Sequence, residues 1–191
     1  MDKDIFTNSP DDISAETKDQ QDKAPTSAKT LYDLGSMYEY GRGVPQSDTE
    51  AVKWYRMAAE QGYIAAQFHL GMMYHDGKRV PQSDEEAAKW FRMAAEIGSE
   101  YAQTMLGLLY AEGKGVPQSG EEAVKWYRKA AEKGDLVAQF NLGSMYLYGK
   151  GVPQSNEEAY KWYLKAANQG NMDAWKILGE LERSTNIKHD D

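Results

Sequence analysis

The chain has 191 residues, enough for one ordinary domain or a short array of repeats, and its 41% hydrophobic and 27% charged residues are typical of a folded protein. Thirty acidic residues against 22 basic ones give a net charge of −8, which argues against binding to nucleic acid phosphates or anionic membranes. The absence of cysteine excludes disulfides, thiolate metal sites and cysteine nucleophiles.

The N-terminal segment, residues 1–26, is polar and acidic, and beyond Met1 its only large apolar side chains are Ile5, Phe6 and Ile13. Because such a segment cannot bury enough apolar surface to offset its ordering entropy, we expect a disordered tail. The alternative is a short partner-binding motif around Ile5 and Phe6. The segment lacks the features of a secretory leader, and no stretch of the chain approaches the roughly 20 apolar residues of a transmembrane helix. We therefore expect a cytoplasmic protein without membrane insertion, or a periplasmic or secreted one if a leader has been removed.

From Ser27 onward the sequence repeats with a period of 36 residues. The period is marked by five Leu-Gly pairs, four prolines and four tryptophans. These are Leu34-Gly35, Leu70-Gly71, Leu106-Gly107, Leu142-Gly143 and Leu178-Gly179; Pro45, Pro81, Pro117 and Pro153; and Trp54, Trp90, Trp126 and Trp162. The spacing predicts a solenoid over 27–182, with full units at 27–62, 63–98, 99–134 and 135–170, a capping half-unit at 171–182 and a C-terminal tail at 183–191.

Each unit is predicted to be a helix–turn–helix. In the first helix, for example between Val137 and Tyr148, apolar residues recur at helical spacing, and Ser, Asp or Asn stands at the N-cap except in the second unit, which has Tyr63. A Gly-x-Gly-Val-Pro-Gln-Ser connector follows. Arg79 replaces the second glycine of one connector, so we expect a different turn or backbone strain there. The second helix begins at Ser47 or its equivalent, with Glu three residues later, which is the pattern of a capping box.

Gly35 and its equivalents lie inside the first helix, where Gly costs about 1 kcal/mol relative to Ala. We therefore expect another helix backbone to pack against each of them. The Trp and Tyr ladder has helical spacing, so it is expected to fill the seams between units rather than to bind a cofactor. Because one helix pair cannot cover its own apolar face, the units should stack into an all-α, right-handed superhelical α/α solenoid of four full repeats and one capping helix.

The repeat unit is seen most clearly in Ala138-Gln-Phe-Asn-Leu-Gly-Ser-Met-Tyr146 and Glu158-Ala-Tyr-Lys-Trp-Tyr-Leu-Lys-Ala-Ala167. With its 36-residue period and Gly-x-Gly-Val-Pro connector, it closely resembles the Sel-one-like repeat (SLR), a relative of the 34-residue tetratricopeptide repeat. The resemblance implies a bacterial adaptor or scaffold that holds a partner protein on a concave surface formed by the first helices. We expect it to act as a monomer.

The concave surface is expected at the first-helix positions that differ most between units, those equivalent to residues 29, 33, 36 and 40. The candidate partner-binding residues there are Asp33, Tyr40, His69, Met72, Asp76, Tyr101, Met105, Leu108, Glu112, Asn141 and Tyr148. Their aromatic and Met side chains are typical of interface cores, and the acidic ones would face Lys or Arg of a helical or extended partner. The alternative is that these side chains pack between units or face water.

The sequence contains no recognisable catalytic motif. His69 and His75 are six residues apart, which places them about 240° apart around a helix, so they cannot form an i, i+4 zinc pair. The connectors lack the Gly-Lys-Ser/Thr of a phosphate-binding loop, and no Gly-x-Ser-x-Gly elbow occurs. We therefore expect a non-enzymatic adaptor without cofactor or metal. The alternatives are an immunity protein that neutralises a toxin or secreted effector and, less favoured, a hydrolase acting on cell-wall or β-lactam substrates.

Overall fold

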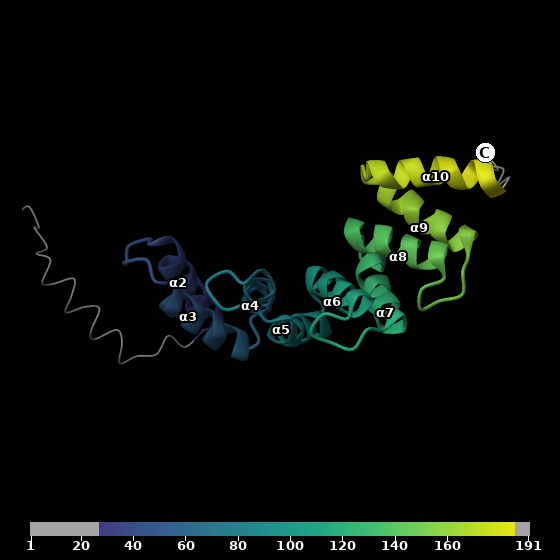
Figure 1. Ribbon diagram of the computed structural model, residues 1–191. Coiled ribbons are helices and arrows are strands. Elements are labelled where there is room, and N and C mark those ends of the chain that lie inside the picture. The colour runs from purple at the N-terminus through teal and green to yellow at the C-terminus, as the bar shows by residue number, and fades with distance from the viewer. Residues whose placement is uncertain (1–26, 186–191) are drawn as a thin grey trace, which may run out of the picture.

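The computed structural model describes residues 27–185, and within this range every regular element is an α-helix. The helices are α2 (Ala28–Tyr40), α3 (Asp48–Glu60), α4 (Ile64–Asp76), α5 (Asp84–Glu96), α6 (Glu100–Glu112), α7 (Gly120–Glu132), α8 (Leu136–Tyr148), α9 (Asn156–Asn168) and α10 (Met172–Thr185). They form the all-α solenoid of stacked helix pairs that the 36-residue period predicts (Figure 1). The predicted tail 1–26, with its Ile5–Phe6 motif, lies outside the described residues, and α10 continues past residue 182.

The helices follow one another as a curved array (Figure 1). Each helix makes its extensive contacts with the helices immediately before and after it. The first helices of the units, α2, α4, α6 and α8, lie along the inner side of the curve, and the second helices lie outside them (Figure 1). The fold therefore presents one face of every first helix on a common surface.

The helices begin at the predicted N-caps. The side chains of Ser27, Ser99, Asp135 and Asn171 each accept a hydrogen bond from the backbone N–H three residues on. Tyr63 makes no side-chain capping bond, as its side chain predicts. Each such cap stabilises its helix by about 1 kcal/mol.

The predicted capping boxes of the second helices form only in part. The Ser47 hydroxyl accepts from the Glu50 N–H, but the Ser47 N–H donates to the carbonyl of Tyr38 in the preceding helix, 3.0 Å away. The Glu50 carboxylate pairs instead with Lys53. The same serine N–H bond recurs in all four units, so it ties the start of each second helix to the end of the first.

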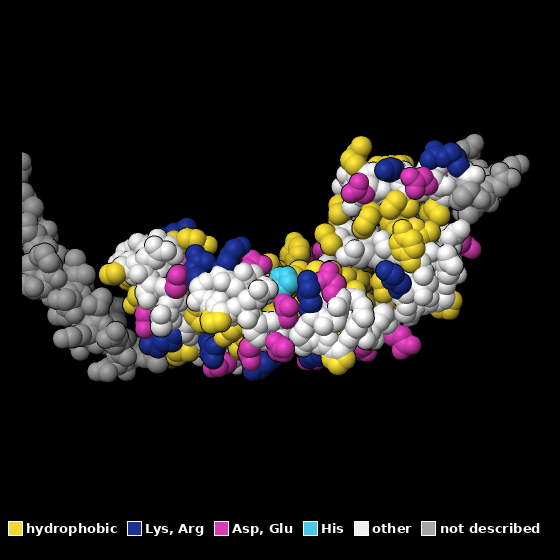
Figure 2. All heavy atoms as spheres, viewed as in Figure 1, with side chains coloured by type: hydrophobic (Ala, Val, Ile, Leu, Met, Phe, Trp, Pro, Cys, Tyr) yellow, Lys and Arg dark blue, Asp and Glu magenta, His cyan; other side chains and the backbone are white. Residues whose placement is uncertain are grey.

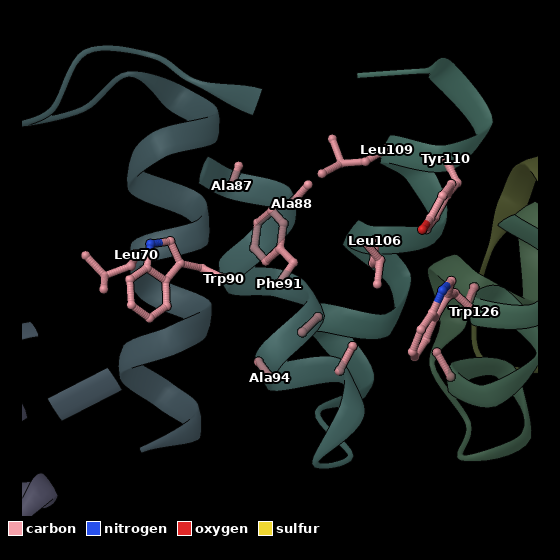
Figure 3. Close-up of a cluster of buried hydrophobic side chains, with 14 of the residues drawn as sticks. Leu70, Ala87, Ala88, Trp90, Phe91, Ala94, Leu106, Leu109, Tyr110 and Trp126 are labelled. Atoms are coloured by element: carbon pink, nitrogen blue, oxygen red, sulfur yellow. The ribbon is translucent and has the colours of Figure 1, made fainter. Parts of the chain in front are cut away.

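The core combines leucines of the first helices with small and aromatic residues of the second. Leu70 of α4, Phe91 of α5 and Leu106 of α6 are fully buried among the side chains that fill it (Figure 3). Across each complete seam an arginine of the second helix bonds a tyrosine hydroxyl of the next unit, as Arg92 does to Tyr110 at 2.7 Å. The ladder of large side chains is therefore structural, as its spacing predicts.

The glycines inside the first helices face aromatic rings rather than the helix backbone that the sequence analysis expects. A Cβ added at Gly107 would lie 2.7 Å from the Tyr127 ring of the same unit, closer than van der Waals contact allows. Gly35, Gly71 and Gly143 face the equivalent rings in the same way. The aromatic side chain reaches across the gap between the helices and leaves no room for a methyl group. Gly179 differs, because no second helix follows α10 within the described residues, and its nearest neighbour would be an Arg183 nitrogen at 3.6 Å.

We predict that Gly107→Ala and Gly179→Ala shift stability in opposite directions, although both replace the same position of the repeat. Gly107→Ala should lower the free energy of unfolding by about 1–3 kcal/mol, since the new methyl group collides with the Tyr127 ring. Gly179→Ala should raise it by up to about 1 kcal/mol, because only the higher helix propensity of Ala remains. Urea unfolding followed by circular dichroism measures both, and an equal effect of the two changes would contradict the packing described.

Candidate partner-binding surface

The predicted partner-binding residues all lie at least partly accessible on the first helices. Asp33, Tyr40, Asp76, Tyr101, Glu112 and Tyr148 are exposed, and His69, Met72, Met105, Leu108 and Asn141 are half-buried. The three tyrosines stand out, with 55% of Tyr40, 62% of Tyr101 and 66% of Tyr148 accessible. Contiguous exposed apolar patches mark interaction sites, whereas single exposed apolar residues are common on protein surfaces. We call the set of eleven the first-helix stripe.

Several residues of the first-helix stripe also have structural contacts. Met72 and Met105 pack partly against the buried core, so their side chains support the fold as well as the surface. The acidic members each pair with a nearby lysine, namely Asp33 with Lys29, Asp76 with Lys78 and Glu112 with Lys114, at 2.7–2.8 Å. The stripe therefore presents exposed ion pairs rather than the bare carboxylates that the sequence analysis expects.

An apolar hollow of about 570 Å³ opens between the N-terminal ends of α4 and α6. Its lining residues are Gly62, Tyr63, Ile64, Ala65, Phe68, Ser99 and Tyr101. Of these, only Tyr101 belongs to the predicted set. The Phe68 and Tyr101 ring centroids lie 6.2 Å apart, so the two aromatic groups flank one space.

The sequence analysis missed Phe68 because its position is not one of the four positions assigned to the concave surface, those equivalent to residues 29, 33, 36 and 40. The equivalents of Phe68 are Tyr32, Thr104, Phe140 and Lys176. The sequence did offer a signal for Phe68, because it is aromatic and directly precedes His69 of the predicted set. The hollow forms at the second unit because Phe68 is aromatic and the next unit has Tyr101. At the following seam Thr104 instead donates a hydrogen bond to Asp135, 3.0 Å away.

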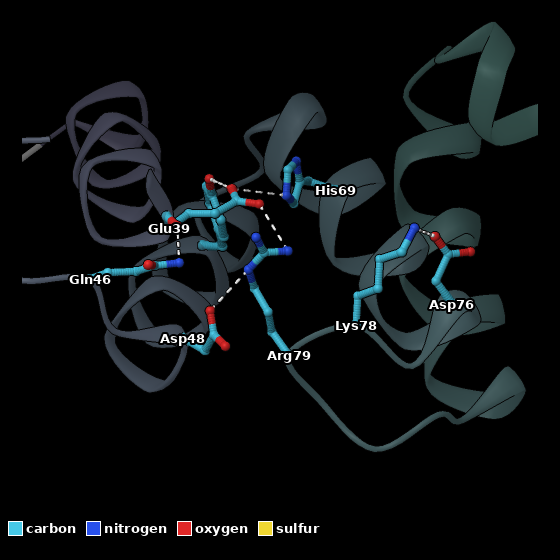
Figure 4. Close-up of polar contacts among 8 residues, drawn as sticks. Glu39, Gln46, Asp48, His69, Asp76, Lys78 and Arg79 are labelled. Carbon is cyan, nitrogen blue, oxygen red and sulfur yellow. Dashed lines mark hydrogen bonds and ion pairs between the residues drawn. The ribbon is translucent and has the colours of Figure 1, made fainter. Parts of the chain in front are cut away.

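A buried ionic cluster lies in the seam between the first two units. The Glu39 carboxylate is only 3% accessible, and it accepts a hydrogen bond from the Tyr55 hydroxyl at 2.5 Å. His69 Nε2 lies 3.4 Å from Glu39 Oε2, and an Arg79 guanidinium nitrogen lies 3.3 Å from Oε1 (Figure 4). Arg79 also pairs with Asp48 at 3.0 Å. The buried charge is therefore matched on both oxygens, as burial of a carboxylate requires.

Arg79 occupies a left-handed backbone conformation, with φ of 67°, as the glycines of the other connectors do. The connector thus keeps its turn and carries strain at Arg79, which is the second of the two outcomes that the sequence analysis leaves open. At the next seam a Cβ on Gly115 would lie 2.0 Å from the Asp84 carbonyl oxygen. A side chain fits at Arg79 only if this connector stands further from the preceding helix, and the ion pairs with Glu39 and Asp48 fill the extra space.

The surroundings of the cluster shift the pKa values of His69 and Tyr55. Burial lowers the pKa of His69, and the Arg79 charge lowers it further, although Glu39 opposes both effects. Burial and the hydrogen bond to Glu39 raise the pKa of Tyr55 well above its usual range. His75 lies outside the cluster, with Nδ1 3.2 Å from Asp84.

Within residues 27–185, no three His, Asp or Glu side chains are arranged to hold a metal ion. The described helices also include none with the length and apolar character needed to cross a bilayer.

We predict that Arg79→Gly destabilises the fold even though it restores the connector glycine. Loss of the ion pair leaves the charge of Glu39 buried without its partner, which costs about 3–5 kcal/mol, and relief of the left-handed conformation returns only about 1–2 kcal/mol. The double change Glu39→Ala with Arg79→Gly copies Ala111 and Gly151 at the seam between the third and fourth units, so it should be more stable than Arg79→Gly alone. Urea unfolding of the single and double variants measures the coupling, and strict additivity would show that the two residues do not interact.

We predict that His69 makes stability fall as the solution becomes acidic. Because its pKa is lowered in the folded state, the unfolded chain binds the proton more readily below about pH 6.5, so acid favours unfolding. His69→Asn copies Asn141 of the fourth unit and should lose less stability than the wild type between pH 7.5 and 5.5. Thermal unfolding at several pH values tests this, and parallel curves for the two proteins would contradict it.

The four repeats match a known repeat family. The Sel1 repeat model matches residues 28–63, 64–99, 100–135 and 136–171, one residue later than the units defined above. A comparison with curated proteins gives no match.

Several solved structures are similar to this one, and three of them are compared below. A protective antigen of uropathogenic Escherichia coli with an SLR fold shares 39% identity over 88% of this chain, with a TM-score of 0.79. A Sel1 repeat protein of Oxalobacter formigenes shares 40% identity over 81%, with a TM-score of 0.73. Cysteine rich protein B of Helicobacter pylori shares 26% identity over 70% of this chain and 96% of its own, with a TM-score of 0.55. The chain spans only 36% and 45% of the length of the first two.

Proposed function

The chain belongs to the Sel1 repeat family, since four copies of that repeat cover residues 28–171, and on this premise we propose that it is a non-enzymatic adaptor. Sel1 repeat proteins are generally protein-interaction scaffolds. In this proposal a partner polypeptide lies along the inner surface of the first helices and contacts the first-helix stripe.

The observation that carries the proposal is the exposure of Tyr40, Tyr101 and Tyr148 together with the apolar hollow beside Tyr101. Tyrosine offers a large rigid apolar surface and a hydroxyl, and it is enriched where binding energy concentrates. The hollow of about 570 Å³ is large enough to take an apolar side chain of a partner. Burial of such an anchor supplies affinity without any rearrangement of the helices.

The ion pairs of the stripe restrict the chemistry of the partner. Because Asp33, Asp76 and Glu112 already pair with lysines, a basic partner residue gains little from them. We therefore infer that apolar side chains of the partner contribute most of the affinity. Charged groups at the rim then affect the register of the bound partner and the rate of association more than the affinity.

We predict that the triple change Tyr40→Ala, Tyr101→Ala and Tyr148→Ala abolishes partner capture from the native cell and leaves the melting temperature nearly unchanged. Each tyrosine is more than half exposed, so the fold loses little, whereas interface tyrosines often contribute 2 kcal/mol or more, equivalent to about 30-fold in Kd. The matched control is Ile97→Ala, since Ile97 is 51% accessible and lies outside the stripe.

Affinity capture with mass spectrometry identifies partners, and titration calorimetry with the purified partner gives the change in Kd. The proposal fails if the triple variant and the Ile97→Ala control capture the same proteins with the same affinity. Loss of the fold in the triple variant would instead show that the tyrosines are structural.

The net charge of −8 favours a second candidate, an immunity protein that neutralises a basic toxin or secreted effector by direct binding. A captured partner with enzymatic activity would decide between the two roles. Neutralisation requires that the chain inhibits this activity at stoichiometric concentration, whereas an adaptor leaves it unchanged.

A further inference from the structure

Two hydrogen-bond acceptors beside the apolar hollow lack the donor that their equivalents have in later units. In the fourth unit, Gln169 Nε2 donates to the Gly134 carbonyl at 2.9 Å and to Gln139 Oε1 at 2.8 Å. In the third unit, Lys133 Nζ donates to the Gly98 carbonyl at 2.7 Å. The same position of the repeat therefore supplies a donor to the preceding glycine in both units.

In the second unit this position is Ile97, whose side chain has no donor. The two acceptors are here the Gly62 carbonyl and Gln67 Oε1, the equivalents of the two oxygens that Gln169 binds. Within residues 27–185 no donor bonds the Gly62 carbonyl, and Gln67 Oε1 is buried without a hydrogen-bond partner. A buried acceptor without a partner is costly, so a donor that reaches it is favoured.

The side-chain amide of Gln67 has the same orientation as that of Gln139. Gln67 Nε2 donates to the Ala59 carbonyl at 3.0 Å, and Gln139 Nε2 makes the equivalent bond at 3.1 Å. The Oε1 atoms of the two side chains therefore point the same way relative to their units. A donor placed in the second unit where Gln169 Nε2 lies in the fourth would reach both free oxygens.

These acceptors adjoin the apolar hollow. Gly62 is exposed and lines the hollow, as does Phe68, the residue directly after Gln67. The other walls are mainly apolar and include the Tyr101 ring, and an aromatic ring attracts a cation over its face. The space therefore suits an aliphatic stem that ends in a positively charged N–H donor.

The charges near the hollow favour a cation over a neutral amide. Glu60 and Glu100 each lie within two residues of a lining residue. Neither forms an ion pair in the described part of the chain, unlike the acidic members of the first-helix stripe. The nearby ammonium of Lys133 is already bonded to the Gly98 carbonyl.

We propose that the hollow binds a lysine side chain of the partner polypeptide. The lysine stem packs against Phe68 and Tyr101, and the ammonium donates to the Gly62 carbonyl and to Gln67 Oε1. Ile97 is 51% accessible, so its side chain can turn aside to admit the ammonium. This inference rests on the proposed function and identifies the side chain whose apolar stem fills the hollow.

A peptide probe tests the site without knowledge of the partner. An acetylated and amidated Ala-Lys-Ala peptide should bind with Kd of about 1–10 mM and shift the NMR signals of the Ile64 and Ala65 methyl groups, which line the hollow. The same peptide with norleucine keeps the stem but lacks the ammonium, so it should bind at least about tenfold more weakly. Equal binding of the two peptides, or no binding of either at about 20 mM, would overturn the proposal.

Substitution of Ile97 tests the site from within the chain. Ile97→Lys copies Lys133 and should place its own ammonium on the Gly62 carbonyl, so binding of the lysine peptide should weaken at least about tenfold without a fall in melting temperature. Ile97→Gln copies Gln169 and should act in the same way. The matched control Ile97→Ala supplies no donor and should bind the peptide like the wild type. If Ile97→Lys and Ile97→Gln also bind it like the wild type, the lysine site is wrong.

Capture of the native partner separates this proposal from the adaptor proposal. A partner that is lost from the triple tyrosine variant but held with unchanged affinity by Ile97→Lys overturns the lysine site and leaves the adaptor proposal intact. A partner held equally by the triple tyrosine variant and the wild type overturns both. Loss of the partner from both variants, with retention by Ile97→Ala, is the result expected.

Discussion

The stacking of an aromatic ring on a helical glycine is the contact on which the rest of this structure depends. The rings of Tyr55, Phe91 and Tyr127 come within about 2.5–2.7 Å of the place where a Cβ would stand, so the two helices of each unit approach to a fixed distance. That distance places the first helices side by side along the inner surface of the curve, and the residues that they expose there are free to vary.

On the face of the molecule drawn in Figure 2, the hydrophobic side chains at the surface gather over α8 to α10.

The seams between units are not equivalent. At Gly115 and Gly151 the connector backbone lies directly against the start of a preceding second helix, so no side chain could be accommodated. At Arg79 a long basic side chain takes this space and neutralises buried Glu39. The N-terminal seam therefore adds a buried ionic contact to its close packing, and the lowered pKa of His69 makes this seam sensitive to pH.

Much of the fold could be predicted from the sequence, because caps, turns and helical spacing act locally and the period repeats them. The partner of each internal glycine could not, since Gly35 and Tyr55 are separated in sequence and either a backbone or a ring would explain a missing side chain. The stripe was found from variation between units, whereas the hollow at Phe68 depends on which side chains meet across a seam. The cluster at Glu39 required knowledge of where Arg79 points.

The restriction of extensive contacts to consecutive helices has a consequence for how the chain acquires its structure. No part of the described array must wait for a distant segment, so low contact order favours rapid folding, and each helical hairpin can form on the ribosome soon after its residues emerge. Under mechanical tension the same architecture should yield hairpin by hairpin from its ends rather than in one cooperative event.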